Sequence, residues 1–202
     1  MQVGDHMSTL LVSTIRDAAA GSTITVPTSG TFTLGGGWRL LTTTTISSVS
    51  SVEFTGMTTS YDTYAFVFSG VLPTTDSKEL QAVLQTNGGS YRTGGSDYYH
   101  GTTSNAFMAL QAGNGAGANG TSNAAGDGGV NGVMFLSNAM NASKQSHMEG
   151  KISWWRVSDA GTINSDIAHQ LRQTEANDAI KFDFTGSDTM VSGKISQYGI
   201  SK

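Results

Sequence analysis

The 202-residue chain has 13 % charged residues, 26 glycines, no cysteine and a formal net charge of −4. This length supports one substantial core plus an arm rather than two full domains. The negative charge argues against a nucleic-acid partner, which would need a stripe of Lys and Arg. The missing cysteines exclude disulfides and thiolate metal sites. Because neither a signal-peptide pattern nor a long apolar run is present, we also expect no membrane partner.

The first 42 residues contain few and scattered apolar side chains. Such a segment cannot bury enough surface on itself to offset the entropy of ordering its backbone. We therefore predict an N-terminal anchoring arm over residues 1–42 that buries Leu10, Leu11, Val12 and Ile15 against a neighbouring molecule. The alternative is an ordinary N-terminal strand of the same domain.

The following segments alternate apolar and polar residues with the period of two expected of strands. Ile46, Val52 and Phe54 share one phase, and residues 61–68 predict a central strand that is covered on both faces. Residues 80–85 alternate until Asn87-Gly88-Gly89, where the glycines accept the positive φ of a tight turn, so a hairpin is expected there.

Residues 111–132 are rich in Gly, Ala, Asn and Ser, and only Val130 is a sizeable apolar residue. This composition predicts a long loop. No helical pattern follows it, so a phosphate-binding loop is disfavoured. Packing between subunits is the favoured role for the loop, and a plain flexible excursion is the alternative.

Two apolar segments come next, at residues 133–136 and 150–157. The adjacent Trp154 and Trp155 must point to opposite faces of a strand. We name Trp154, Trp155 and Arg156 as candidates for a subunit interface, because Trp and Arg are enriched at binding hot spots. The alternative is that both indoles pack inside the domain. Residues 165–172 fit either a helix or a strand, because Ile163, Ile167 and Leu171 lie on one face of both.

Residues 179–186 and 191–200 read as two further strands. Together with the run from Val52 to Tyr91, they resemble small β-sandwich structural proteins of tailed bacteriophages. Ser8-Thr9-Leu10, Val12 and Thr14-Ile15-Arg16-Asp17-Ala18 resemble the opening segment of phage tail-fibre proteins, which docks the appendage to the particle. The resemblance favours a strand over residues 165–172.

Candidate catalytic groups are dispersed. The four histidines lie in separate segments without metal-ligand spacing, and no Gly-x-Ser-x-Gly motif occurs. We therefore expect no enzyme activity, no cofactor and no metal site. Tyr98 and Tyr99, next to His100, are candidates for stacking on a sugar ring, because aromatic faces suit such surfaces.

These observations predict an all-β, jelly-roll-like antiparallel β-sandwich of roughly eight strands over residues 43–202, preceded by the arm. The resemblance implies a structural protein on the outer surface of a phage head or tail, made in the host cytoplasm. Its expected partners are other virion proteins and copies of itself, with a trimer as the favoured oligomer. The alternative is a receptor- or carbohydrate-binding module of the tail that recognises a host glycan.

Overall fold

The computed structural model describes residues 37–100, 103–111, 121–156 and 161–200. Nearly all of these residues form strands or the turns between them. The predicted anchor residues Leu10, Leu11, Val12 and Ile15 lie outside the described residues, and so does the centre of the glycine-rich loop at 112–120. The anchoring role of the arm therefore stays a prediction.

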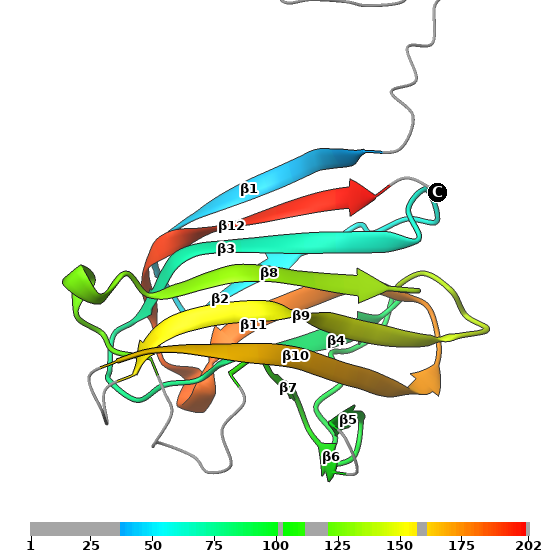
Figure 1. The fold of residues 1–202 in the computed structure, drawn as a ribbon. Helices are drawn as coiled ribbons and strands as arrows, with labels where there is room; N and C mark the ends of the chain where they lie inside the picture. The colour runs from blue at the N-terminus through cyan, green and yellow to red at the C-terminus, as the bar shows by residue number, and fades with distance from the viewer. Residues whose placement is uncertain (1–36, 101–102, 112–120, 157–160, 201–202) are drawn as a thin grey trace, which may run out of the picture. The chain divides into compact units, whose positions relative to one another are not determined.

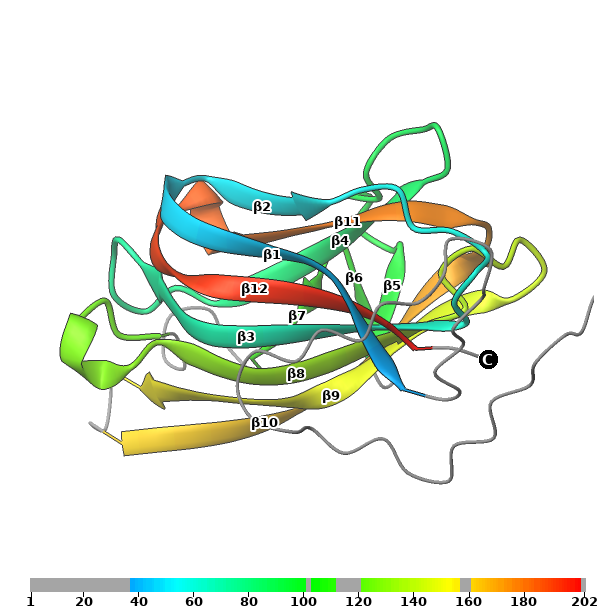
Figure 2. The same cartoon turned by 90° about the horizontal axis from the view of Figure 1, so that it is seen from above.

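Two antiparallel sheets pack against each other (Figures 1 and 2). The larger sheet has, in spatial order, β1 (Trp38–Val49), β12 (Met190–Ile200), β3 (Thr63–Pro73), β8 (Val130–Ser137), β9 (Gln145–Arg156), β10 (Gly161–Thr174), β5 (Tyr98–His100) and β6 (Thr103–Asn105). The smaller sheet has β2 (Ser51–Phe54), β11 (Asn177–Phe184), β4 (Leu80–Thr86) and β7 (Met108–Ala109). Two short 3₁₀ turns, η1 (Ala125–Asp127) and η2 (Thr185–Ser187), complete the described elements.

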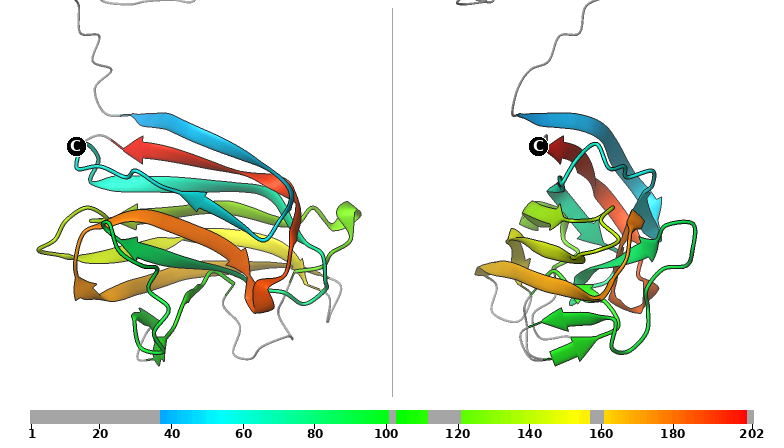
Figure 3. Two further views of the ribbon diagram at one scale, coloured as in Figure 1. Left: turned by 180° about the vertical axis from the view of Figure 1, so that it is seen from behind. Right: turned by 90° about the vertical axis from the view of Figure 1, so that its right-hand side faces the viewer.

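The predicted all-β sandwich is confirmed. Seen from behind, the four-stranded sheet lies in front of the larger one (Figure 3). The eight-plus-four division differs from the roughly eight strands that we expected, because β5, β6 and β7 are only two or three residues long and leave little sequence signal.

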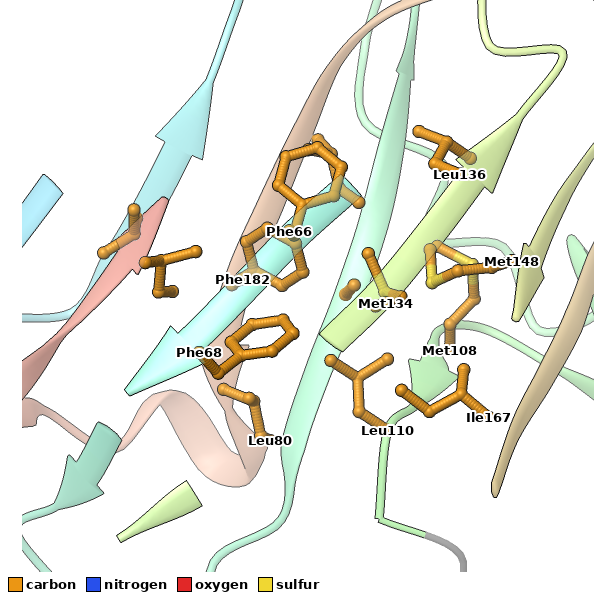
Figure 4. Close-up of a cluster of buried hydrophobic side chains, with 14 of the residues drawn as sticks. Phe66, Phe68, Leu80, Met108, Leu110, Met134, Leu136, Met148, Ile167 and Phe182 are labelled. Atoms are coloured by element: carbon orange, nitrogen blue, oxygen red, sulfur yellow. The ribbon is translucent and has the colours of Figure 1, made fainter. Parts of the chain in front are cut away.

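Aromatic rings from both sheets form the centre of the core (Figure 4). The Phe182 ring of β11 lies 5.3 Å from the ring of Phe66 and 5.2 Å from that of Phe68, both on β3. Phe54 of β2 contacts Phe66 and Phe182 in turn. Edge-on and tilted contacts of this kind add to the burial of apolar area, so this cluster joins the two sheets.

The alternation seen in the sequence is confirmed along most strands. On β3, Tyr64, Phe66 and Phe68 are buried between the sheets, and Ala65 is covered on the opposite face. β10 is a strand, as the resemblance predicted, with Ile167 and Leu171 in the core. On β11, Ile180, Phe182 and Phe184 face the interior.

The sandwich begins earlier than residue 43. Trp38 pairs with Ile200, and Thr42 pairs with Gln197, so residues 38–42 belong to β1 rather than to the arm. The threonine-rich stretch 42–45 carries no apolar alternation to mark its pairing, which is why the predicted boundary was wrong. Ile46 also lies in a different sheet from Val52 and Phe54, because the chain turns between β1 and β2.

The turn after β4 is confirmed, but the predicted hairpin is brief. Gly88 has φ +69°, and the reversed chain brings the Arg92 N–H to the Leu84 carbonyl at 2.8 Å. Only Gln85 and Tyr91 pair as a bridge there, because β4 takes its strand partners from β11 and β7.

The glycine-rich loop is shorter than 111–132, since Val130 opens β8. Its two ends are held together at its base. The Gln111 side chain accepts a hydrogen bond from the Leu80 N–H and donates one to Thr121 Oγ1 at 2.7 Å, and both Gln111 and Thr121 are buried.

Candidate functional site

The adjacent tryptophans of β9 divide as predicted between two faces. Trp154 is buried in the core, so its candidacy for a subunit interface was wrong. Trp155 is half-buried on the opposite face of the larger sheet, followed by the half-buried Arg156. The Trp155 carbonyl accepts a hydrogen bond from the Ser122 N–H at 3.0 Å, so this end of β9 is tied to the end of the glycine-rich loop. An interface at Trp155 and Arg156 stays a prediction.

The tyrosine pair of β5 divides in the same way. Tyr98 is wholly buried, and its hydroxyl accepts a hydrogen bond from the Leu84 N–H and donates one to the Arg92 carbonyl. Burial raises the pKa of this phenol. Tyr98 therefore cannot stack on a ligand, which corrects our expectation for this residue. Tyr99, which pairs with Gln170 of β10, is only partly buried.

Tyr99 lines a shallow hollow of about 260 Å³ on the outer face of β5, β9 and β10. Strand alternation places the side chains of its neighbours on the same outer face, because residues at every second position point the same way. The lining residues are Tyr99, His147, Glu149, Ala168 and Gln170, with Met148 and His169 between them on their strands.

Arg172 fixes the Tyr99 ring beside this hollow. The guanidinium carbon lies 4.7 Å from the ring centroid, and Nη1 donates a hydrogen bond to the Ser96 carbonyl at 3.1 Å. A cation held over an aromatic face is attracted by the ring quadrupole. The hollow therefore has one pre-oriented aromatic wall next to a carboxylate, an imidazole and an amide.

Two histidines meet on the inner side of the same strands. The His169 ring of β10 lies 4.7 Å from that of His100 on β5, and His169 Nε2 lies 2.7 Å from the Ala109 carbonyl oxygen of β7. His169 thus links the two sheets. Burial lowers the pKa of His169 to about 4, although its contact with the Ala109 carbonyl opposes the shift.

The lowered pKa predicts an acid-sensitive fold. The unfolded chain binds the His169 proton near pH 6.5, whereas the folded chain resists it down to about pH 4. Stability from His169 is therefore complete above pH 6.5 and is lost as the pH falls to 4, by about 3 kcal/mol in the free energy of unfolding. Urea unfolding of wild type and His169→Gln at pH 7 and pH 4 should show a smaller pH dependence in the variant. His147→Gln, at an exposed position on β9, is the matched control; equal slopes for wild type and His169→Gln would contradict the prediction.

Sequence reasoning found Tyr99 but missed its neighbours. Glu149 and His147 stand at alternate positions of β9, and Gln170 and Arg172 do so on β10. That alternation is readable in the sequence. The register that brings Gln170 opposite Tyr99 is not, because the two residues are 71 positions apart and no local pattern connects them.

Within the described residues, no group of three or more His, Cys, Asp or Glu side chains is arranged to hold a metal ion. Nor does that part of the chain contain a helix long and apolar enough to cross a membrane. The fold and the hollow define an all-β antiparallel sandwich with an aromatic-walled depression on its larger sheet. Comparisons with protein-family models, curated proteins and solved structures found no match.

Proposed function

We propose that this chain is a structural protein of a tailed-phage virion, carried on the outer surface of the head or tail and made in the host cytoplasm. One observation carries the proposal. The separate segments that resemble phage sandwich proteins fold against one another: β11 lies between β2 and β4, and β12 pairs with β3. The resemblance therefore falls on two sets of neighbouring strands, one in each sheet of the sandwich.

In this proposal the body is the displayed part and residues 1–37 are the anchor, shortened from 1–42 because residues 38–42 pair in β1. Leu10, Leu11, Val12 and Ile15 dock on a neighbouring head or tail protein. Copies associate around a threefold axis, with Trp155 and Arg156 at the contact. Several weak surfaces then hold each chain at once, which raises the overall affinity.

Immunogold electron microscopy tests the proposal. Antibodies against the purified protein should label intact tailed-phage particles released from cells that carry the gene, and the labelled position distinguishes head from tail. The full chain with Leu11→Glu and Ile15→Glu should no longer join the particles, whereas Thr14→Glu is the matched control. Particles that never carry the label would contradict the virion role. If the particles bound the double variant as tightly as they bind the wild type, the predicted anchoring role of these residues would be contradicted.

The hollow beside Tyr99 favours a second candidate function, recognition of a host glycan. Its volume is below the usual range for drug-sized ligands and suits a small polar molecule. A sugar ring would place its C–H face on Tyr99, and its hydroxyls would reach Glu149, Gln170 and His147. This mode of binding uses both the apolar face and the polar rim of the hollow.

Tyr99→Ala should weaken glycan binding about fivefold, since an aromatic stacking contact contributes on the order of 1 kcal/mol. A glycan array would identify the ligand, and titration calorimetry would measure the dissociation constants. Trp155→Ala, which removes an outward aromatic residue away from the hollow, is the control. Equal losses in both variants, or an array without any bound glycan, would contradict the site.

A further inference from the structure

The exposed large apolar side chains gather on one edge of the larger sheet. Among the residues that the structure describes, they are Trp38, Leu40, Leu41, Val49 and Val191, and all lie on β1 or at the start of β12. Leu40 is 54 % exposed and Trp38 is 49 % exposed. Scattered single apolar residues are normal on a protein surface, but a concentration on one element indicates an interaction site.

This edge also differs from the others in length. β1 has 12 residues, and in the described part of the chain it has a strand on only one side, β12 (Figure 1). The three other sheet edges are β6 with 3 residues, β2 with 4 and β7 with 2. Short edge strands are one way in which proteins avoid pairing with other chains. Among the outermost strands of the described sheets, β1 lacks that protection. β10 is also open over residues 161–169, because β5 pairs with it only at Gln170 and Leu171, but no exposed large apolar side chain lies there.

The composition of β1 favours pairing as well. Its centre is Thr42-Thr43-Thr44-Thr45, a run of high β propensity, and the strand contains neither Lys nor Pro. Its one charged side chain, Arg39, lies 3.4 Å from the Tyr61 hydroxyl, to which Nη1 donates. The Tyr61 hydroxyl is neutral and Arg39 is exposed, so a second strand could add its backbone hydrogen bonds only with this guanidinium left in solvent.

The apolar residues stand at both ends of β1. Trp38, Leu40 and Leu41 lie at its start, and Val49 lies at its end, next to Val191 because β12 pairs there through Met190. An antiparallel copy of the same strand brings the start of one strand to the end of the other. Threonines then meet threonines in the middle. The irregularities at Leu41 and at Ser48, which has φ +52°, interrupt the regular ladder on either side, so the apolar ends meet through their side chains.

We propose that two copies of this chain associate through antiparallel pairing of their β1 strands about a twofold axis near Thr43 and Thr44. The larger sheets then continue across the dimer. A twofold contact of this kind is self-complementary and closed, so it adds one partner and stops. It is separate from the contact proposed for β9, and it does not depend on the virion role.

Cysteine cross-linking of the full chain tests the geometry, because the natural sequence has no cysteine. Single variants Leu40→Cys, Thr43→Cys, Thr44→Cys and Ser47→Cys are oxidised mildly and examined on a denaturing gel. Paired residues of antiparallel strands have Cα atoms about 4.5–5.5 Å apart, within disulfide range. Two-chain species should form at Thr43 or Thr44 and not at Leu40 or Ser47. Thr162→Cys on β10 is the control.

A charge exchange gives a second, independent readout. Leu40→Lys alone and Val49→Glu alone should each weaken dimerisation at least about tenfold in sedimentation equilibrium, since each buries an unpaired charge. The chain with both substitutions should recover, because the lysine introduced in one copy then lies within reach of the glutamate introduced in the other. Within one strand the two positions are about 30 Å apart. Recovery therefore requires the antiparallel contact, and circular dichroism confirms that the variants fold.

The proposed dimer would be supported by cross-links that form only at Thr43 or Thr44 and by recovery of dimerisation in the double variant. A monomer throughout the micromolar range would overturn it, as would cross-links of equal strength at all four positions, which indicate parallel or unspecific contact. A trimer without β1 cross-links would also overturn it, while agreeing with the threefold contact. Failure of the virion proposal leaves all of these readouts unchanged.

Discussion

Replacing Phe182 by alanine should lower the free energy of unfolding by about 4 kcal/mol. Its ring is fully buried and contacts the rings of Phe54, Phe66 and Phe68, so the change removes the central contact between the two sheets. Truncating a buried aromatic residue loses its transfer free energy and leaves a cavity that the two sheets cannot fill. Equilibrium unfolding in urea, monitored by tryptophan fluorescence, measures the loss.

Lys144→Ala provides the control for this experiment, because Lys144 is exposed in the turn before β9. A change of no more than about 0.5 kcal/mol is expected there. If Phe182→Ala cost less than about 1.5 kcal/mol, the site would have collapsed around the alanine. The rings would then not form the rigid connection that we describe between the sheets.

Gly132→Ala should be comparably damaging, with a loss of about 3 kcal/mol or more. Gly132 of β8 has φ +141°, and a Cβ there would lie 2.3 Å from the Lys151 carbonyl oxygen of β9. The added methyl group meets backbone rather than a movable side chain. Both strain and overlap must therefore be relieved by separating β8 from β9, in the middle of the larger sheet.

Gly126→Ala is the matched control for Gly132→Ala. Gly126 lies in η1, has no positive φ, and a Cβ there would contact nothing within 4 Å. Its substitution should be neutral or slightly stabilising, because alanine restricts the unfolded chain. Thermal unfolding of both variants gives the comparison. Equal melting temperatures would show that β8 and β9 tolerate the wider spacing.

The sequence predicted strands where burial imposes a strict alternation. Tyr64, Phe66 and Phe68 on β3 are examples, because the core requires an apolar side chain at every second position. Prediction failed where burial is one-sided or absent. β1 has a single buried residue, Ile46, so nothing in its side-chain pattern marks residues 38–42 as part of a sheet.

Which distant strands pair with each other could not be predicted from the sequence, for a different reason. The order of the larger sheet joins β10 to β5 and β1 to β12, and only the complete fold determines these neighbours. The candidate site depends on them. Tyr99 was predicted as a stacking residue, but the carboxylate, imidazole and amide beside it come from β9 and β10. Tyr98 was wrongly predicted to stack on a sugar. The sequence does not show which of two adjacent tyrosines on a strand faces the core, so both looked like candidates.

Trp38 pairs with Ile200, so the two ends of the described body lie side by side. They belong to the edge strand β1 and to its neighbour β12. A force that pulls these two ends apart acts along the hydrogen bonds between β1 and β12. The bonds nearest the ends therefore break first, and the others follow one after another. Strands pulled from opposite ends would instead share the load across the whole ladder. The body therefore yields first at Trp38 when tension is applied through its ends, and β3 next to β12 stays paired until β12 itself has peeled away.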